Sequence, residues 1–393
     1  MTASRGNATH YLILFIVAIC LPALLFLKVR DPILLGGYIL CLLGILLSRR
    51  YAVLTYATII LCTFTAALAL IDLYVSFFAD RSTQAFSGSY AGSYFQRYPE
   101  IGYNARPSRQ YQSVRYDKVS GKVIYDATYT ISELGFRKTL GAENGEKIVF
   151  LGDSAMFGEG LNDNQALPQI FSDLTDRKFH VMNFGFHGYG PQQALRMLET
   201  GLFDSQIGNS PKLFVLQVHP WLVQRTACIP DYTYRGPKYA IGPDGAVRYA
   251  GSCRSDAFYY LDYALKQSPG LGFIWSSINL RPLRKDDFDL FLKVVSKIDE
   301  IAKNKYHSRL LIVYLKYDDG LFASSGYSNE KILDYFRNSG LSFIEATLRE
   351  YLRSDGKNDG LTIPDDGHPT ETANARRAHL VVDWFREYSS GRN

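Results

Sequence analysis

Three uncharged, strongly apolar stretches open the chain, at residues 11–27, 33–48 and 51–71. A helix needs about 20 apolar residues to cross the ~30 Å hydrocarbon layer of a membrane, and each stretch approaches that length. The pattern therefore predicts three transmembrane helices within residues 1–80. A buried helical hairpin is the alternative, and a cleaved signal peptide would account for the first stretch alone.

A β-rich connecting region is expected at residues 81–146. Stretches 111–116 and 122–125 are rich in β-forming residues, and the turn residues between them predict a hairpin. Residues 125–131 are rich in Tyr and Thr, which predicts a further strand.

From residue 147 onward, short and continuously apolar segments alternate with amphipathic ones. Strands that are apolar on both faces are typical of a parallel sheet covered by helices on each side. Residues 147–393 are therefore predicted to form one α/β domain. Reactive groups of such sheets gather at the carboxyl ends of the strands. The expected strands are 147–151, 179–184, 212–218, 309–315 and 342–345, and the expected helices are 166–175, 192–202, 286–304, 329–338 and 370–388.

Charge narrows the possible partners and the location. The net charge is +5 without a run of basic residues, so nucleic acid is not expected as a partner. The basic residues beside the apolar stretches favour a cytoplasmic N-terminus by a single charge. With three spans, the region after residue 80 is then expected outside the cytoplasm, periplasmic or extracellular.

Two cysteines lie in the part of the chain that follows the apolar stretches. Cys228 and Cys253 flank an insert at 229–252 that is rich in Gly, Pro and Tyr. In an oxidising compartment they are expected to form a disulfide. Two unrelated free thiols are the alternative, because connectivity cannot be deduced from sequence.

A candidate nucleophile stands directly after the first expected strand of the sheet, in Gly152-Asp153-Ser154. Backbone N–H groups beside such a Ser can hold a developing oxyanion. Far downstream, Asp365 lies three residues before His368, so one loop can deliver a carboxylate and an imidazole together. His368 would take the Ser154 proton and Asp365 would orient the imidazole, with Asp366 as a competitor for that role. A capped helix start and a plain surface loop are the structural alternatives.

A glycine-rich loop follows the second expected strand. Residues 183–193 hold three glycines within six positions. Such loops let the backbone approach another group closely, so their amides are candidates for a second oxyanion donor. A plain strand-to-helix turn is the alternative.

Taken in this order, the three motifs resemble the blocks of the SGNH hydrolase family, also called GDSL esterases and lipases. The resemblance covers about residues 147–390. It implies a flavodoxin-like three-layer α/β/α sandwich and a catalytic Ser, Asp and His at the positions named above. It also implies that Gly188 is the oxyanion glycine and that Asn183 belongs to the same oxyanion or substrate-binding block.

One block of the family is missing. Its usual Gly-x-Asn-Asp has no counterpart after the third expected strand, where the chain continues as His219-Pro220-Trp221. Either His219 replaces the Asn as oxyanion donor, or two backbone amides suffice; a His219 that only caps the strand is the alternative. Some members that handle acetyl groups on polysaccharides also lack this Asn. In this respect the chain resembles polysaccharide O-acetyltransferases and esterases.

These observations predict a membrane-anchored serine esterase or deacetylase that removes acyl groups, chiefly acetyl, from envelope glycans. Two alternatives stay open: an O-acyltransferase that uses the same acyl-Ser154 intermediate, and a non-catalytic envelope protein that binds a glycan or a partner. Tyrosines within 90–103 and 232–239 are candidates for stacking on sugars. The lipid bilayer and a membrane acyl-donor protein are further expected partners. No cofactor or metal is expected, because neither zinc-ligand spacing nor a phosphate-binding loop is present.

Overall fold

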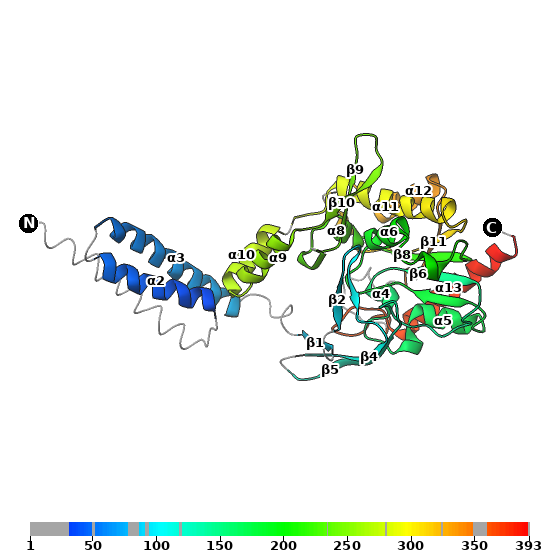
Figure 1. Cartoon of the computed structure of the whole chain (residues 1–393), viewed down its shortest axis with the longest axis horizontal. Helices are drawn as coiled ribbons and strands as arrows, with labels where there is room; N and C mark the ends of the chain where they lie inside the picture. Colours follow the sequence, from blue (N-terminus) through cyan, green and yellow to red (C-terminus); the bar gives the residue numbers. More distant parts are fainter. Residues whose placement is uncertain are drawn as a thin grey trace, which may run out of the picture. The chain divides into compact units, whose positions relative to one another are not determined.

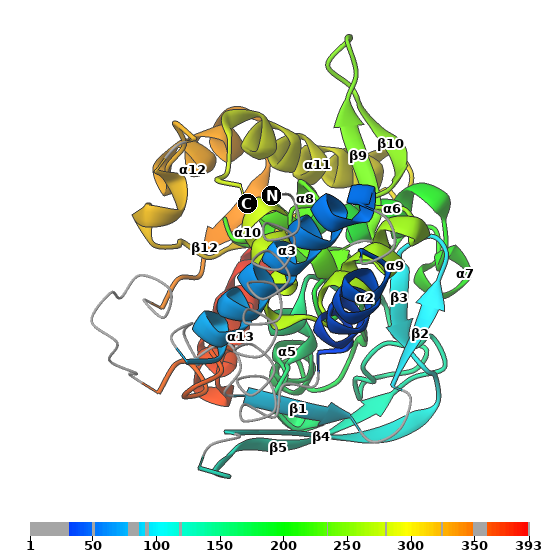
Figure 2. The same cartoon turned by 90° about the vertical axis from the view of Figure 1, so that its left-hand side faces the viewer.

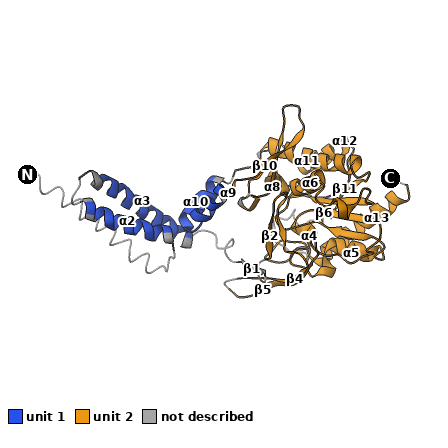
Figure 3. Ribbon diagram, in the orientation of Figure 1, with its two compact units in different colours: residues 1–84, 256–280 blue, residues 85–255, 281–393 orange. Residues whose placement is uncertain are grey.

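The computed structural model (Figure 1 and, turned by 90°, Figure 2) describes residues 31–48, 52–77, 86–90, 94–117, 120–233, 235–279, 281–323, 325–348 and 360–391. The chain divides into two compact units (Figure 3): Met1–Gln84 with Asp256–Leu280, and Ala85–Ser255 with Arg281–Asn393. This division differs from the boundaries expected from the sequence. Most of the connecting region predicted at 81–146 belongs to the same unit as the sheet, and the segment at 256–280 belongs to the N-terminal unit.

The smaller unit contains two helices from the apolar stretches and two from the later segment. Cys41 and Cys62 pack together where α2 meets α3. The carboxylate of Asp72 in α3 accepts a hydrogen bond from the N–H of Gly270 in α10, which ties the later segment to the first. The helices of this unit in the described residues are α2 (Pro32–Ser48), α3 (Ala52–Phe77), α9 (Asp256–Leu265) and α10 (Pro269–Asn279).

The three predicted membrane spans are not supported. The first, at 11–27, lies outside the described residues. The second corresponds to α2, whose 17 residues rise only about 25 Å, and the third corresponds to α3. No helix in the described part of the chain combines the length and the apolar character that a membrane crossing requires.

The larger unit is built around a parallel five-stranded sheet in the order β12-β11-β8-β6-β7. Strands β11, β8 and β6 of this sheet are labelled in Figure 1. Counted along the chain from the β7 edge, the strand order is the order 2-1-3-4-5 of flavodoxin-like folds. The order reverses between β6 and β8, and ligands of such folds bind beside this switch point. Each strand lies within one residue of its predicted bounds: β6 (Lys147–Leu151), β7 (His180–Asn183), β8 (Leu213–Val218), β11 (Leu310–Tyr314) and β12 (Ser342–Glu345).

Helices cover both faces of this sheet. Successive side chains of a strand point to opposite faces, so each continuously apolar strand supplies side chains to the helices on either side. Ile148 and Phe150 pack in one cluster with α5 and α13, which lie side by side (Figures 1 and 2). Val149 and Leu151 pack in the other cluster with α6, α11 and α12. The predicted α/β fold with a parallel sheet between helices is therefore confirmed. The helices are α4 (Ser154–Phe157), α5 (Leu167–Leu174), α6 (Pro191–Thr200), α7 (Asp204–Ile207), α8 (Leu222–Thr226), α11 (Lys285–Asn304), α12 (Asn329–Asn338) and α13 (Glu371–Ser389).

The connecting region contributes small antiparallel sheets to the larger unit. The predicted hairpin is present as β4 paired with β5, and the separate strand expected at 125–131 is the continuation of β5. Tyr111 and Tyr129, one from each strand, are buried in the core that also covers the main sheet. The strands are β1 (Phe86–Tyr90), β2 (Phe95–Tyr98), β3 (Gly102–Ala105), β4 (Arg109–Asp117) and β5 (Val123–Ile131).

The insert between the two downstream cysteines forms a hairpin of β9 (Pro237–Ile241) and β10 (Val247–Ser252). It projects from the larger unit in both views (Figures 1 and 2). Cys228 and Cys253 are joined by the predicted disulfide, with their Cα atoms 5.3 Å apart. Closing a loop of this length stabilises a protein by about 3 kcal/mol, mainly by restricting the unfolded chain.

Candidate active site

Ser154 is the first residue of α4, just beyond the carboxyl end of β6 and therefore at the switch point of the sheet. Asp153 caps the helix, and its carboxylate accepts the N–H of Ala155 at 3.0 Å. Only 5% of Ser154 is exposed. The hydroxyl of Ser154, just after β6, is therefore largely shielded from solvent.

The structure brings this hydroxyl and the distant imidazole together. Ser154 Oγ lies 2.8 Å from His368 Nε2, and His368 Nδ1 lies 2.5 Å from Asp366 Oδ1. Arg115 from strand β4 forms an ion pair with the other carboxylate oxygen of Asp366, at 2.7 Å. A hydroxyl, an imidazole and a buried carboxylate therefore stand in line, the arrangement that acyl transfer through serine requires.

Asp366, not Asp365, occupies the orienting position, and the prediction of Asp365 needs correction. The backbone at Asp365 has a φ of 60°, which turns the chain so that the Asp365 side chain is exposed. The side chain of Asp366 is fully buried, and its Oδ1 also accepts the backbone N–H of His368 at 3.1 Å. The turn thereby selects one of two adjacent aspartates.

A second carboxylate, which the sequence did not reveal, reaches the same imidazole. Glu159 Oε2 lies 3.5 Å from His368 Nε2 and 2.7 Å from His187 Nδ1. His187 Nε2 in turn lies 3.0 Å from the hydroxyl of Tyr94. A chain of polar contacts therefore runs from the connecting region to the candidate base. Glutamate is usually solvated, so no sequence signal separates Glu159 from a surface residue.

The charges around the imidazole set its protonation. Burial by itself lowers the pKa of His368, but the carboxylates of Glu159 and Asp366 outweigh burial and raise that pKa to about 9. Burial would raise the pKa of Glu159, but His187 and His368 hold it at about 2. At neutral pH His368 therefore carries a proton and Glu159 is ionised.

This protonation predicts an alkaline pH profile. Only neutral His368 can accept the Ser154 proton, so kcat/KM for p-nitrophenyl acetate should rise with pH until about pH 9. Glu159→Gln removes a negative charge beside the imidazole, lowers its pKa, and should move this rise to lower pH. Glu300→Gln, at an exposed position of α11, is the matched control. A rise at the same pH in wild type and Glu159→Gln would contradict this electrostatic role.

The glycine-rich loop lies against the helix that begins with Ser154. A Cβ on Gly185 would come within 2.7 Å of the backbone nitrogen of Phe157, so only glycine allows this approach. Gly188 has a φ of 69°, and its Cβ would meet the hydroxyl of Tyr103 at 2.6 Å. The backbone at Gly188 is therefore held against Tyr103, and its N–H remains the candidate for a second oxyanion donor.

Asn183 holds this loop in place. Its Nδ2 donates to the carbonyl of Met156 at 3.1 Å, and its Oδ1 accepts the N–H of Gly185 at 2.9 Å. Both ends of the amide are thus engaged between the loop and α4. These contacts give Asn183 a positioning role and do not direct it to the substrate.

His219 contacts Asp153. Its Nε2 lies 3.3 Å from Asp153 Oδ2, which also accepts a hydrogen bond from Arg225 Nη1 at 3.0 Å. Burial would raise the pKa of Asp153, but His219 and Arg225 outweigh burial and hold the pKa well below its usual range. These contacts do not support the predicted donor role of His219, and they leave backbone amides as the candidate donors.

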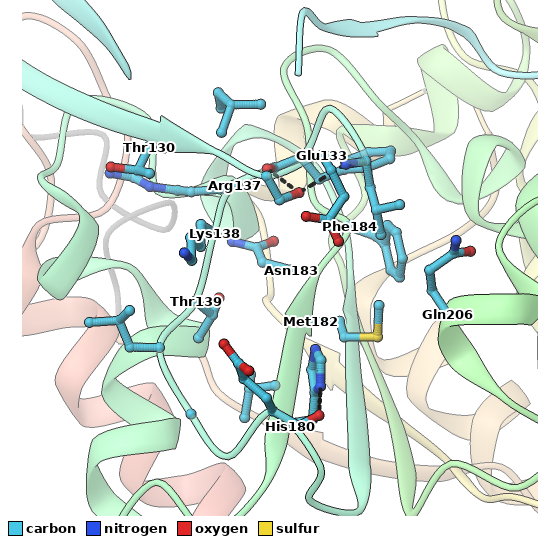
Figure 4. Close-up of a pocket in the computed structure, with 18 of the residues that line it drawn as sticks. Thr130, Glu133, Arg137, Lys138, Thr139, His180, Met182, Asn183, Phe184 and Gln206 are labelled. Carbon is cyan, nitrogen blue, oxygen red and sulfur yellow. Dashed lines mark hydrogen bonds between the residues drawn. The ribbon is translucent and has the colours of Figure 1, made fainter. Parts of the chain in front are cut away.

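A further groove of the described surface lies away from these side chains. It has a volume of about 1090 Å³ and runs along the edge strand β7, with Asn183, Thr139 and Phe184 among the residues that line it (Figure 4). Ser154 and His368 do not line it. Arg137, at the wall of this groove, is buried. Its guanidinium donates hydrogen bonds to the carbonyls of the segment after Ser154 and so stabilises that segment.

The structure separates the tyrosines proposed to stack on sugars into buried and exposed ones. Tyr94 and Tyr239 are each 2% exposed and lie in the core. Tyr232 is exposed and packs its ring near Gly188. Tyr234 lies outside the described residues.

No protein-family model matches the chain. No curated protein matches it by sequence either. Among solved structures, it is similar to a member of the lipolytic G-D-S-L family from Veillonella parvula, at 14% identity over 61% of this chain and 98% of that chain, with a TM-score of 0.36. An acetylxylan esterase from Geobacillus stearothermophilus, solved as a catalytic mutant, gives 10% identity, 63% and 96% coverage and a TM-score of 0.34. An esterase from Pseudoalteromonas is 10% identical to the chain, over 62% of this chain and 99% of that chain, with a TM-score of 0.34. Similarities of this size establish neither a family nor an activity.

Proposed function

We propose that the larger unit is a serine hydrolase that cleaves carboxylic esters through an acyl-Ser154 intermediate. The contact that carries the proposal is the 2.8 Å approach of Ser154 Oγ to His368 Nε2, with Asp366 on the far side of the ring. A buried hydroxyl paired in this way with a neutral imidazole is poised for nucleophilic attack.

The residues divide the chemistry as follows. Neutral His368 takes the Ser154 proton while Oγ attacks the ester carbonyl, and the resulting oxyanion lies toward the backbone N–H groups. The imidazolium then protonates the departing alkoxide, which leaves the acyl group on Ser154. Water attacks this acyl group with His368 as base, releasing the carboxylic acid and restoring Ser154. The carboxylate of Asp366, which forms an ion pair with Arg115, keeps the Nδ1 proton in place and stabilises the imidazolium.

The proposed substrates are small acyl esters, chiefly acetyl esters, of envelope glycans. The chain lacks the Gly-x-Asn-Asp block of the SGNH hydrolases, as do some members that handle acetyl groups on polysaccharides. This likeness supports the choice. The test is incubation with an acetylated oligosaccharide, alone and with an unacetylated acceptor. Free acetate as the product supports hydrolysis, acetylated acceptor identifies an O-acyltransferase, and no acetyl loss from this ester or p-nitrophenyl acetate would contradict an enzymatic role.

We also propose that the larger unit works outside the cytoplasm, attached to the cell membrane through the N-terminal region. The Cys228–Cys253 disulfide supports an oxidising compartment. The uncharged stretch at 11–27 supports the attachment. Protease added to intact spheroplasts should degrade the larger unit; protection until the cells are lysed would contradict this location.

A further inference from the structure

Aromatic rings from two strand ends meet beside the candidate active site. The ring of Tyr317, after β11, stacks on that of His219, after β8, with centroids 5.9 Å apart and planes 18° apart. Trp221 also stacks on Tyr317, at 5.9 Å and 26°. His219 contacts Asp153, the neighbour of Ser154, whereas Trp221 is 39% exposed. The stacked rings therefore connect the surroundings of the nucleophile with the surface.

The backbone that carries the central ring, that of Tyr317, is held in place by hydrogen bonds to Asn329. The side chain of Asn329 accepts the backbone N–H of Tyr317 at 3.1 Å and donates to its carbonyl at 2.8 Å. The same Asn329 oxygen accepts the hydroxyl of Tyr314 at 3.0 Å. A platform held this way loses little conformational entropy when a ligand binds to it, which favours affinity.

A polar pocket adjoins the platform. It has a volume of about 380 Å³ and shares Tyr317 with the stacked rings. Its remaining lining consists of polar side chains that can bond hydroxyl groups: Lys316, Asp318, Asp319, Ser328, Asn329 and Glu330. Three carboxylates against one ammonium group make this lining electronegative.

We propose that Trp221, Tyr317 and the adjoining pocket form a subsite for an uncharged pyranose unit of the substrate. An aromatic face covers the apolar C–H face of a sugar ring, and surrounding polar groups bond its hydroxyls. The excess of carboxylates disfavours uronates and other anionic sugars, as well as anionic lipid headgroups. The assignment rests on the proposed function, because it makes the glycan part of the ester the group that is recognised.

The test separates sugar recognition from ester chemistry. Trp221→Ala should raise KM for an acetylated xylo-oligosaccharide by about tenfold, the effect of losing one stacking contact, with kcat little changed. Its kcat/KM for p-nitrophenyl acetate, which has no sugar, should stay within about twofold of wild type. Trp221→Phe should restore most of the KM. Tyr249→Ala, an equally exposed aromatic residue on the hairpin, is the matched control and should change neither substrate.

A binding measurement keeps the proposal testable if the protein proves inactive. Calorimetric titration of Ser154→Ala with unacetylated xylo-, cello- and manno-oligosaccharides should show binding that Ser154→Ala/Trp221→Ala lacks. No Trp221-dependent binding to any of them would overturn the subsite. Preferential binding of oligogalacturonate, or Trp221-dependent binding to phosphatidylglycerol vesicles, would overturn the assignment to an uncharged sugar.

Discussion

Ser154→Ala should lower kcat/KM for p-nitrophenyl acetate by roughly 10⁴-fold or more, because the methyl group cannot attack the carbonyl. Ser154 Oγ is the hydroxyl in contact with the imidazole of His368, at 2.8 Å, and binding alone cannot replace a nucleophile. The measurement is steady-state hydrolysis of the purified variant, with circular dichroism to verify the fold.

Ser205→Ala is the control for this variant, because Ser205 is exposed on α7. It should keep wild-type activity. Retention of more than a few per cent of wild-type activity by Ser154→Ala would show that ester cleavage occurs without this hydroxyl, and the acyl-Ser154 mechanism would be abandoned.

Asp366→Asn should lower kcat by about 10⁴-fold with a much smaller effect on KM, the pattern of a triad whose acid is neutralised. The amide cannot stabilise the imidazolium, and an amide N–H turned toward Nδ1 would favour the wrong tautomer of His368. Arg115 would also lose its ion-pair partner. Kinetics with p-nitrophenyl acetate across pH 6 to about 10 measure both parameters.

The neighbouring aspartate provides a matched control of the same chemistry. Asp365→Asn changes an exposed side chain one position away and should leave kcat within about threefold of wild type. A large loss in Asp365→Asn together with an active Asp366→Asn would reverse the assignment of the two residues.

The sheet could be predicted because its signal is local. Continuous apolar runs such as 147–151 become strands buried on both faces, and their alternation with helices makes the sheet parallel. The helices α9 and α10 were not predicted. Their segment is short and rich in aromatic residues, and it is stabilised by packing on α3, a contact nearly 200 positions away along the chain, as between Asp72 and Gly270.

The site could be predicted only in part, for a related reason. The sequence indicated Ser154 and His368, since each stands in a recognisable motif. Choosing Asp366 over Asp365 depends on a backbone turn, and the contact of Glu159 with two imidazoles depends on how three loops meet. The prediction that Tyr94 stacks on a sugar was wrong, because the clustering of tyrosines in the sequence does not reveal which of them are buried.

Active-site labelling is the most direct test of the central claim, that Ser154 is an activated nucleophile. The folded protein is treated with a fluorophosphonate, digested, and mapped by mass spectrometry. We expect one phosphonyl group on the peptide that contains Ser154, none on Ser154→Ala, and slower labelling of Asp366→Asn. Folded wild-type protein that stays unlabelled, or that carries the label on another residue, would contradict the mechanism and favour a glycan- or partner-binding role without catalysis.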